Sequence, residues 1–209
     1  MDVGGSATSA TAAPVLDGIL RRRSPVAFTD QRPPQELVVR LLEAATLAPN
    51  HHLNQPWRFF VLTGAALEQY ANLLADKHRA QLTDSADLTN SSAPNAQAQV
   101  EATRRKAMRA PVLVVVASVQ TGHPKAMEME DVEATAGAAE HIVLAAPDLG
   151  LGAMLRSGAA AYDLDVKAFL GITPADHIVA LIYLGYPKST RSPQPRDPVA
   201  SKTTWLGWQ

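Results

Sequence analysis

Cysteine is absent from the 209-residue chain. Disulfide bonds, metal sites built on thiolates and cysteine nucleophiles are therefore excluded. An excess of charge of one sign is also absent, because 19 lysines and arginines face 20 aspartates and glutamates. The net charge of -1 gives no electrostatic reason to expect binding to nucleic acid or to an anionic membrane surface.

Long apolar runs are missing as well, since none approaches the roughly 18–20 residues that a membrane-spanning helix needs. Residues 1–14 have neither the basic region nor the apolar region of a secretory signal, and we interpret them as a flexible tail. The lack of cysteine is compatible with a reducing compartment. We therefore expect a cytoplasmic protein that makes no contact with membranes.

Several motifs of catalysis and ligand binding are absent. The chain has no phosphate loop of the form GxGxxG or GxxxxGKS/T, no GxSxG nucleophile elbow and no HExxH metal motif. Gly150 and Gly152 form only a bare GxG pair, which would let the backbone approach a ligand closely. The histidines show no metal-ligand spacing, so we expect no metal site. They stand at positions 51, 52, 78, 123, 141 and 177.

What is present is the composition of a folded domain. Hydrophobic residues make up 46% of the chain and charged residues 19%, which is typical of a globular protein. The order of the predicted elements indicates an α+β or mixed α/β fold in one domain over residues 15–209. Periodicity and β-branched runs predict helices at 15–23, 37–47, 64–82, 99–109, 128–149 and 163–170, and strands at 58–63, 111–118 and 178–184.

Three stretches of this domain are expected to interrupt or leave the regular helices and strands. Residues 83–98 are the most polar stretch and are interpreted as a loop. Pro147 falls late in the longest predicted helix, where it should cause a kink or an early end. From residue 187 to residue 209, prolines alternate with basic residues, which indicates an extended arm outside the compact fold. The arm ends with Trp205 and Trp208, and we expect it to pack on a partner subunit.

The first candidate site is the run Arg22, Arg23 and Ser24, where the chain leaves a helix. Guanidinium groups and a hydroxyl bind a monoester phosphate well, and consecutive residues can turn these groups to one side. Arginines at the C-terminal end of a helix also interact favourably with the helix dipole. A phosphate site and a helix cap are therefore both open at this point.

The second candidate site is the loop 49–56. Five of the six side chains from Asn50 to Gln55 are polar. Amides and imidazoles match the edge of a flat isoalloxazine ring, which carries carbonyl and ring-nitrogen acceptors and one N–H. A polar surface loop is the alternative. The helix predicted at 37–47 could hold this loop and the arginine cluster in one place, as parts of a flavin site.

With these two sites, the sequence resembles the nitroreductase family of FMN-dependent oxidoreductases over about residues 16–198. The resemblance implies an α+β fold with a central mixed or antiparallel sheet surrounded by helices, an extended C-terminal arm, and an intertwined homodimer with FMN at the subunit interface. It also implies hydride transfer from NAD(P)H to nitroaromatic or quinone-type acceptors in a ping-pong cycle, with the chemistry at flavin N5 and no catalytic side chain. It rests on RRRS at 21–24, APNHHLNQPWRFFVL at 48–62, RAPVLVVV at 109–116, LGLGAMLRSG at 149–158 and IYLGYP at 182–187.

Carried over by position, the resemblance implies which residues bind each cofactor. One basic residue of the arm should meet the FMN phosphate, and Arg191 matches this position, with Lys188 and Arg196 as alternatives. The implied FMN contacts are Arg22, Arg23, Ser24, Leu47, His51, Gln55, Leu155, Arg156, Ser157 and Arg191. The implied nicotinamide contacts are Ala145, Ala146, Pro147, Asp148, Leu149 and Gly150.

Three positions depart from the family pattern. Val26 and Leu47 stand where many or close relatives have arginine, and Leu53 stands where many members have asparagine. The pocket has therefore lost polar contacts, and we expect FMN affinity or substrate choice to differ from the family norm. The alternatives to a reductase are a protein that binds or sequesters flavin without turnover, and an enzyme of the same fold that destroys flavin or removes halogen.

Overall fold

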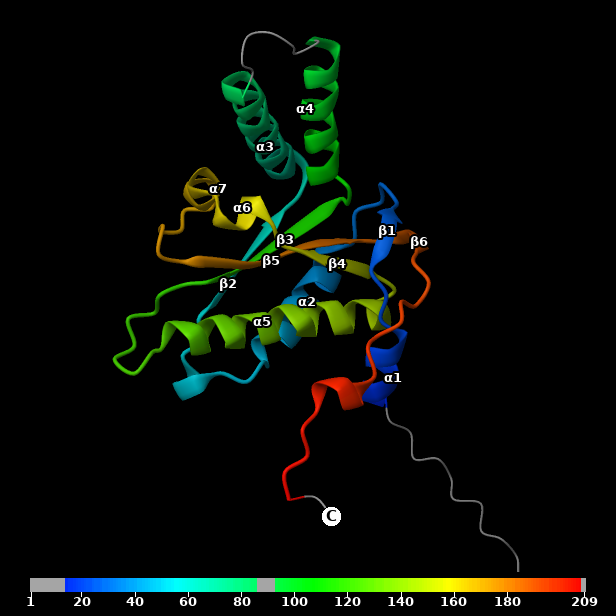
Figure 1. Cartoon of the computed structure of the whole chain (residues 1–209), viewed down its shortest axis with the longest axis vertical. Helices are drawn as coiled ribbons and strands as arrows, with labels where there is room; N and C mark the ends of the chain where they lie inside the picture. The colour runs from blue at the N-terminus through cyan, green and yellow to red at the C-terminus, as the bar shows by residue number, and fades with distance from the viewer. Residues whose placement is uncertain (1–13, 86–92, 208–209) are drawn as a thin grey trace, which may run out of the picture.

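A computed structural model describes residues 14–85 and 93–207 of the chain. Its centre is a four-stranded sheet with the order β2–β3–β5–β4, in which every neighbouring pair is antiparallel. The strands are β2 (Trp57–Leu62), β3 (Val112–Ser118), β4 (Gly152–Arg156) and β5 (His177–Gly185). Helices flank the sheet (Figure 1), which confirms the expected α+β fold.

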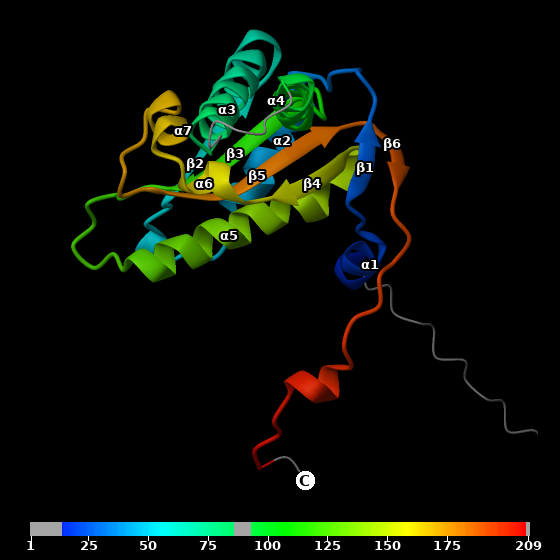
Figure 2. The same ribbon diagram turned by 45° about the horizontal axis from the view of Figure 1, so that its top comes forward.

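The helices form two layers, one on each face of the sheet (Figure 1, Figure 2). The first layer consists of α2 (Gln35–Thr46) and α5 (Glu128–Ala145). The second layer consists of α3 (Gly64–Ser85), α4 (Ala93–Ala107), α6 (Ala159–Tyr162) and α7 (Leu164–Phe169). Each face of the sheet therefore has its own hydrophobic core.

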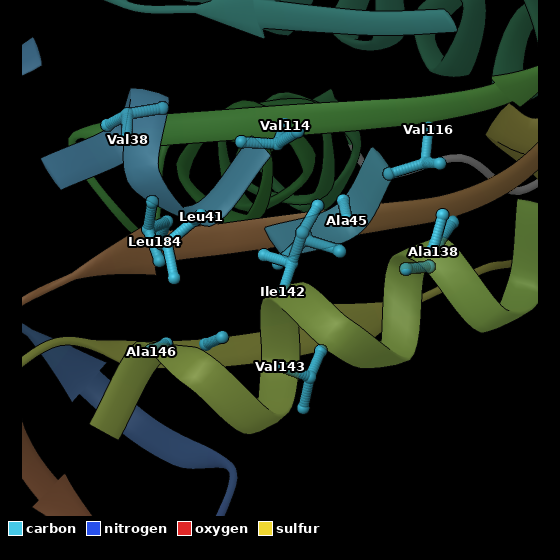
Figure 3. Packing of buried hydrophobic residues seen from close by; sticks show 14 of the residues in the cluster. Val38, Leu41, Ala45, Val114, Val116, Ala138, Ile142, Val143, Ala146 and Leu184 are labelled. Atoms are coloured by element: carbon cyan, nitrogen blue, oxygen red, sulfur yellow. The ribbon is translucent and has the colours of Figure 1, made fainter. Parts of the chain in front are cut away.

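Strand β3 contributes to both cores. All of its residues are buried. Val114 and Val116 pack with Leu41 and Ile142 on the side of α2 and α5 (Figure 3), and the alternate residues of the strand belong to the core under α3 and α4. Fully burying a valine or leucine side chain contributes about 1.5–3 kcal/mol. The continuous apolar run of this strand predicted burial on both faces, and the structure confirms it.

Helix α5 runs along the sheet and packs closely against it. His141 Nδ1 lies 3.0 Å from the carbonyl oxygen of Ala44, which ties α5 to α2. Small side chains on the buried side of α5 allow the backbone to approach its neighbours. They include Ala134, Ala138 and Ala139.

The C-terminal end of α5 confirms the expected effect of Pro147. The α-helix stops at Ala145, because Pro147 has no backbone N–H with which to continue it. A short 3-10 turn, η2 (Ala146–Leu149), follows and is closed by Gly150, whose φ is 70°. This is the left-handed conformation that glycine adopts without strain at a helix end.

Two strands that the sequence did not predict form a separate antiparallel ribbon, β1 (Pro25–Phe28) with β6 (Pro187–Thr190). Residues 187–190 therefore belong to the folded body, which corrects the expectation of an arm that starts at residue 187. The ribbon packs on the start of β4 at Gly152, where an added Cβ would lie 2.5 Å from Pro25 Cγ and 3.3 Å from Pro187 Cβ. Gly152 makes room for these prolines and not for a ligand.

Two segments near the ribbon leave apolar side chains uncovered. Helix α1 (Pro14–Arg21) has no buried residue, and Leu20 on it is 62% exposed. Beyond β6 the chain is extended, with one 3-10 turn at η3 (Val199–Lys202), and it projects away from the sheet (Figure 2). Trp205 is 68% exposed, and Trp208 lies outside the described residues. Packing of the arm on a partner stays a prediction.

Strand β4 and the short helix α6 were not predicted either, and the largest shift of a predicted boundary lies between α3 and α4. Helix α3 continues to Ser85 and α4 begins at Ala93, so the stretch expected as a loop at 83–98 is helical where it is described. Residues 86–92, like residues 1–13 of the predicted tail, lie outside the described part. None of the described helices is long and apolar enough to cross a membrane.

Candidate functional site

The arginine cluster lies between α1 and β1. Arg22, Arg23 and Ser24 are each half-buried, and Arg22 Nη1 donates a hydrogen bond to Ser24 Oγ over 3.3 Å. Within residues 14–85 and 93–207, neither Arg22 nor Arg23 has a carboxylate within ion-pair distance. A guanidinium with no carboxylate partner, beside a hydroxyl, is a donor set that fits a phosphate group.

The structure divides the arginines between the two roles left open by the sequence. Arg21 Nε donates to the carbonyl oxygen of Asp17 over 3.3 Å. Arg23 Nη1 donates to the carbonyl oxygens of Leu20 and Arg22, each at 2.7 Å. Carbonyls of the last turn of a helix lack partners within the helix, so the bond to Leu20 caps α1. The capping role thus applies to Arg23, whereas the Arg22 side chain bonds the Ser24 hydroxyl.

The ribbon of β1 and β6 brings the arm to this cluster. Its terminal pair is Pro25 with Thr190. The strands are antiparallel, so Ser24, which precedes Pro25, and Arg191, which follows Thr190, both lie at this end of the ribbon. The register therefore favours Arg191 as the basic residue that reaches the cluster. The other two basic candidates lie further from the terminal pair, within β6 or beyond it, and are Lys188 and Arg196.

Strand β4 leads from the ribbon toward the predicted residues 155–157. It is an edge strand of the sheet, so one side of its backbone has no strand partner. It starts at Gly152, beside Pro25, and ends at Arg156. Leu155, Arg156 and Ser157 are exposed at its far end. A free strand edge can offer backbone N–H and carbonyl groups to a flat ligand that lies along it.

Strand β5 carries a tyrosine, Tyr183, that lies beside β4 and is influenced by two arginines. Tyr183 pairs with Met154 across the strands, and the Arg109 guanidinium lies 5.0 Å from the centre of the tyrosine ring. Burial raises the pKa of the Tyr183 hydroxyl, although the charges of Arg109 and Arg156 act in the opposite direction. The phenol therefore stays neutral near neutral pH and is not a candidate base.

The loop 49–56 has a strained backbone around the turn η1 (His51–Leu53). The φ angles of His52, Leu53 and Gln55 are 56°, 51° and 48°. Side chains with a Cβ rarely adopt this left-handed region, and each such residue costs about 1–3 kcal/mol unless its surroundings hold it. Because strain of this kind concentrates at functional sites, the backbone favours a binding role over a plain surface loop.

One polar contact attaches this loop to the first turn of α5, and another lies within the loop itself. Asn54 Nδ2 donates a hydrogen bond to Asp131 Oδ1 over 2.7 Å. The backbone N–H of Gln55 donates to Asn50 Oδ1 over 2.9 Å. His51 and Gln55, the two residues predicted to meet the flavin, are both exposed. The sequence reasoning missed Asp131, because 77 positions separate it from Asn54 and no local pattern indicates the contact.

The two predicted halves of the site lie at opposite ends of α5 (Figure 1). Arg21, beside the arginine cluster, is 3.9 Å from Asp148 just after the helix, whereas loop 49–56 is bonded to Asp131 in its first turn. The helical rise between these two aspartates is about 25 Å, which a five-carbon ribityl chain does not span. The sequence predicted that the helix at 37–47 holds loop 49–56 and the arginine cluster close together. Within a single chain this expectation is therefore wrong.

Comparison with known proteins identifies the family. The sequence model described as "Nitroreductase family" matches residues 19–186. The chain belongs to the nitroreductase family. "Putative NAD(P)H nitroreductase YfhC" of Bacillus subtilis (strain 168) is 26% identical over 91% of this chain and 93% of its own length. The protein of the same description from Escherichia coli (strain K12), YdjA, is 29% identical over 83% of this chain and 88% of its own length.

A solved structure of this family has the same fold. It is a crystal structure described as a putative nitroreductase in complex with FMN, from Desulfovibrio desulfuricans. The two chains are 26% identical, the TM-score is 0.70, and the match covers 95% of this chain and all of the other. The nitroreductase fold thus extends over nearly the whole chain.

In this nitroreductase-family chain, the segment predicted to bind nicotinamide forms the end of α5 and the turn η2. Ala146 is fully buried, so its side chain cannot touch a ligand in this conformation. Pro147, Asp148 and Gly150 are exposed, and Asp148 is the carboxylate near Arg21. Nicotinamide contacts at 145–150 stay a prediction that rests on the exposed residues.

The three departures from the nitroreductase pattern all lie on the surface. Leu47 and Leu53 are each 79% exposed, and Val26 is 49% exposed. Leu47 lines a groove of about 380 Å³ whose other walls come from α1 and α5. Leu47 is thus an apolar residue at the mouth of a groove, whereas single exposed apolar residues elsewhere on the surface are ordinary.

Several histidines make side-chain contacts near the N-terminal end of α5. Residues 14–85 and 93–207 hold no group of three or more histidine, aspartate or glutamate side chains that could bind a metal ion. His177 Nε2 lies 2.7 Å from Glu128 Oε1, and the rings of His52 and His123 stack with centroids 5.4 Å apart. These contacts join the loops at the N-terminal end of α5.

Proposed function

We propose that the protein is an FMN-dependent oxidoreductase that passes hydride from NAD(P)H to nitroaromatic or quinone-type acceptors by a ping-pong mechanism. The observation that carries this proposal is the hydrogen-bonded pair of Arg22 and Ser24 at the end of the ribbon where Arg191 follows Thr190, next to the start of the edge strand β4. Membership of the nitroreductase family and the FMN complex of a structural relative support it.

The residues of this chain bind and orient the cofactor in the proposed site. Arg22 and Arg191 neutralise the FMN phosphate, and the Ser24 hydroxyl donates a hydrogen bond to it. The exposed edge of β4 at 155–157 supports one side of the ring. When bound, FMN supplies the redox chemistry by accepting hydride at N5 and passing it on. Since the protein only positions this chemistry, no side chain acts as an obligatory acid or base.

The site is completed by a second copy of the chain. Asp131, which binds Asn54 of the loop, and Asp148, beside Arg21, are about 25 Å apart along α5, so His51 and Gln55 contact the FMN held by the other copy. A two-fold axis makes two equal sites in this way, because each copy gives its loop and receives one. The uncovered apolar side chains of α1 and of the arm, which include Leu20 and Leu206 at 62% and 89% exposure, are buried in the same interface.

The absorbance spectrum of the purified protein tests this function. Flavin bands that bleach on anaerobic addition of NADH or NADPH, and return on addition of a nitroaromatic compound or a quinone, are the expected result. Flavin bands that never bleach would instead indicate a protein that stores flavin. A colourless protein that takes up no added FMN would overturn the proposal.

A further inference from the structure

The loop 49–56 keeps a strained shape without glycine at any of its left-handed positions. His52 and Leu53 precede Asn54, and Gln55 follows it, so three left-handed residues surround one with ordinary helical angles (φ -63°, ψ -29°). Such a backbone relaxes unless contacts from outside the loop hold it. The side chain of Asn54 makes the contacts that could do this.

The Asn54 amide bonds two different segments at once. Its Nδ2 donates to Asp131 Oδ1 over 2.7 Å, and its Oδ1 accepts a hydrogen bond from Thr121 Oγ1. Both ends of the amide are therefore occupied, one by α5 and one by the loop after β3. An amide held at both ends fixes its own backbone more firmly than a single hydrogen bond would.

Asp131 is an unusual partner because it is buried. Only 8% of its surface is exposed, and within the described ranges no lysine, arginine or histidine forms an ion pair with it. Its position in the first turn of α5 lets the helix dipole stabilise the negative charge. A buried carboxylate without a cation makes a strong hydrogen bond to the donor that it has, which here is Asn54.

The other side-chain contacts of the loop are weaker. His51 Nδ1 lies 3.8 Å from Glu130 Oε2, and 63% of the His51 side chain is exposed. An exposed ion pair of this kind contributes little. The stack of His52 on His123 is also made by surface residues. The contact between Asn54 and Asp131 is therefore the strongest side-chain attachment of the loop, in addition to the backbone hydrogen bond that the Val119 N–H donates to the Pro56 carbonyl oxygen over 2.8 Å at the end of the loop.

We propose that Asn54 and Asp131 are positioning residues of the flavin site, which hold loop 49–56 in the shape that presents His51 and Gln55 to the FMN of the second copy. This inference rests on the proposed function. It assigns a role to two side chains that do not touch the cofactor themselves.

The test exchanges the two partners. Asn54→Asp places two carboxylates against each other and removes the hydrogen bond. In the double variant Asn54→Asp/Asp131→Asn, an amide at position 131 can donate to a carboxylate at position 54, and Thr121 can still donate to it. Asn72→Asp is the matched control, because Asn72 Oδ1 also accepts a side-chain hydrogen bond, from Arg104 Nε at 2.9 Å, on the exposed surface of α3.

Two measurements follow the loop and the cofactor separately. In FMN-free protein, amide hydrogen exchange at residues 50–55 should be at least about tenfold faster in Asn54→Asp than in the unaltered protein, and should recover in the double variant. In the FMN-loaded dimer, the FMN dissociation constant should rise about tenfold or more in Asn54→Asp, with a shifted flavin absorbance band. Both should return toward normal in the double variant, and Asn72→Asp should change neither.

The outcomes separate this inference from the proposed function. If Asn54→Asp folds, exchanges at the normal rate and binds FMN normally, the positioning role is wrong while FMN binding stands. If the single and double variants are equally impaired, the reciprocal contact is not what matters, and the inference is also overturned. An unaltered protein that takes up no FMN would overturn the proposed function and this inference together.

Discussion

The two ends of helix α5 are built in opposite ways. At the N-terminal end, loop 49–56 is attached to its own chain by Asn54 and Asp131. At the C-terminal end, α1 has no buried residue and the arm beyond Thr190 projects from the body (Figure 2). The N-terminal end is thus held by hydrogen bonds within its own chain, although Leu53 there is 79% exposed, whereas the C-terminal end leaves α1 and the described part of the arm without a buried residue. In the proposed function, each chain carries two separate half-sites at these two ends.

The largest effect is expected from placing charges on the exposed apolar face of α1. Leu16→Asp with Leu20→Asp places two charges on one face of α1, since these residues lie one turn apart. We expect the dimer to dissociate and FMN to be lost with it, as seen by sedimentation velocity and by flavin content. Leu164→Asp is the control, because Leu164 on α7 is 61% exposed, close to the 62% of Leu20. A dimer that survives the double change would contradict the proposed interface.

The second prediction distinguishes the contributions of Arg22 and Arg23 to FMN binding. Arg22→Ala removes a charged donor from the phosphate and should weaken FMN binding about 10- to 100-fold, as measured by fluorescence titration. Turnover per bound flavin should stay nearly unchanged. Arg23→Ala should weaken binding much less, because the Arg23 guanidinium bonds the carbonyls of Leu20 and Arg22. Equal losses in the two variants would show that the capping bonds do not divide the roles.

A smaller change tests how the ribbon is attached. In Gly152→Ala the new Cβ would meet Pro25 Cγ at 2.5 Å, so we expect a loss of about 1–3 kcal/mol in the free energy of unfolding. The FMN affinity should fall as well, because Ser24 and Arg191 flank the ribbon. Gly137→Ala is the control, since its Cβ would lie 3.8 Å from Ala48 Cβ, an ordinary contact. That variant should be neutral or slightly more stable in denaturant titrations.

The smallest predicted effect is a pH-dependent loss of stability at Asp176, which is bonded to Gln120 and Thr173 of the same chain. Burial alone would raise the pKa of Asp176, but hydrogen bonds from the backbone N–H groups of Gln120 and Thr173 and from the Thr173 hydroxyl hold it below the ordinary value of 3.8. A lowered folded-state pKa stabilises the protein above the ordinary value, and this stabilisation is lost as the pH falls through the folded-state pKa.

Asp176→Asn should therefore lower the free energy of unfolding by about 1 kcal/mol at neutral pH. The difference from the unaltered protein should shrink as the pH falls below 3.8. Urea titrations over this range measure it. The dimer and FMN content at neutral pH should not change, and a difference in stability that grows toward acid pH would contradict the assignment.

The parts of the fold that could be predicted are those with long local signals. The run of β3 and the apolar stripe of α2 are readable because neighbouring residues carry the pattern. Strands β1 and β6 have four residues each, and each begins with a proline, so only their pairing makes them strands. Strand β4 is not predicted because Gly150 and Gly152 indicate a backbone that approaches a ligand as readily as they indicate the start of a strand.

For the candidate site, the sequence indicates residue types and the chemistry that they suit, but not their arrangement in space. The types and spacing of Arg22, Ser24 and Gln55 indicate a phosphate and a polar ring edge. The position of Arg191 depends on the register of the ribbon, which no local pattern gives. The left-handed backbone at Leu53 also has no sequence signal, because leucine does not favour it. The distance between the half-sites depends on the length and direction of α5.

The pairing of β1 with β6 has a consequence for the order of folding. Pro25 and Thr190 touch only after the chain between them has closed into a loop, and the entropy lost in closing a loop grows with its length. Contacts between such distant residues form slowly compared with local ones. We therefore expect the proposed phosphate-binding cluster to be assembled among the last steps, after the central sheet. A chain interrupted before residue 187 would contain all four strands of that sheet and lack the ribbon, so under the proposed function cofactor retention would report that folding has reached its end.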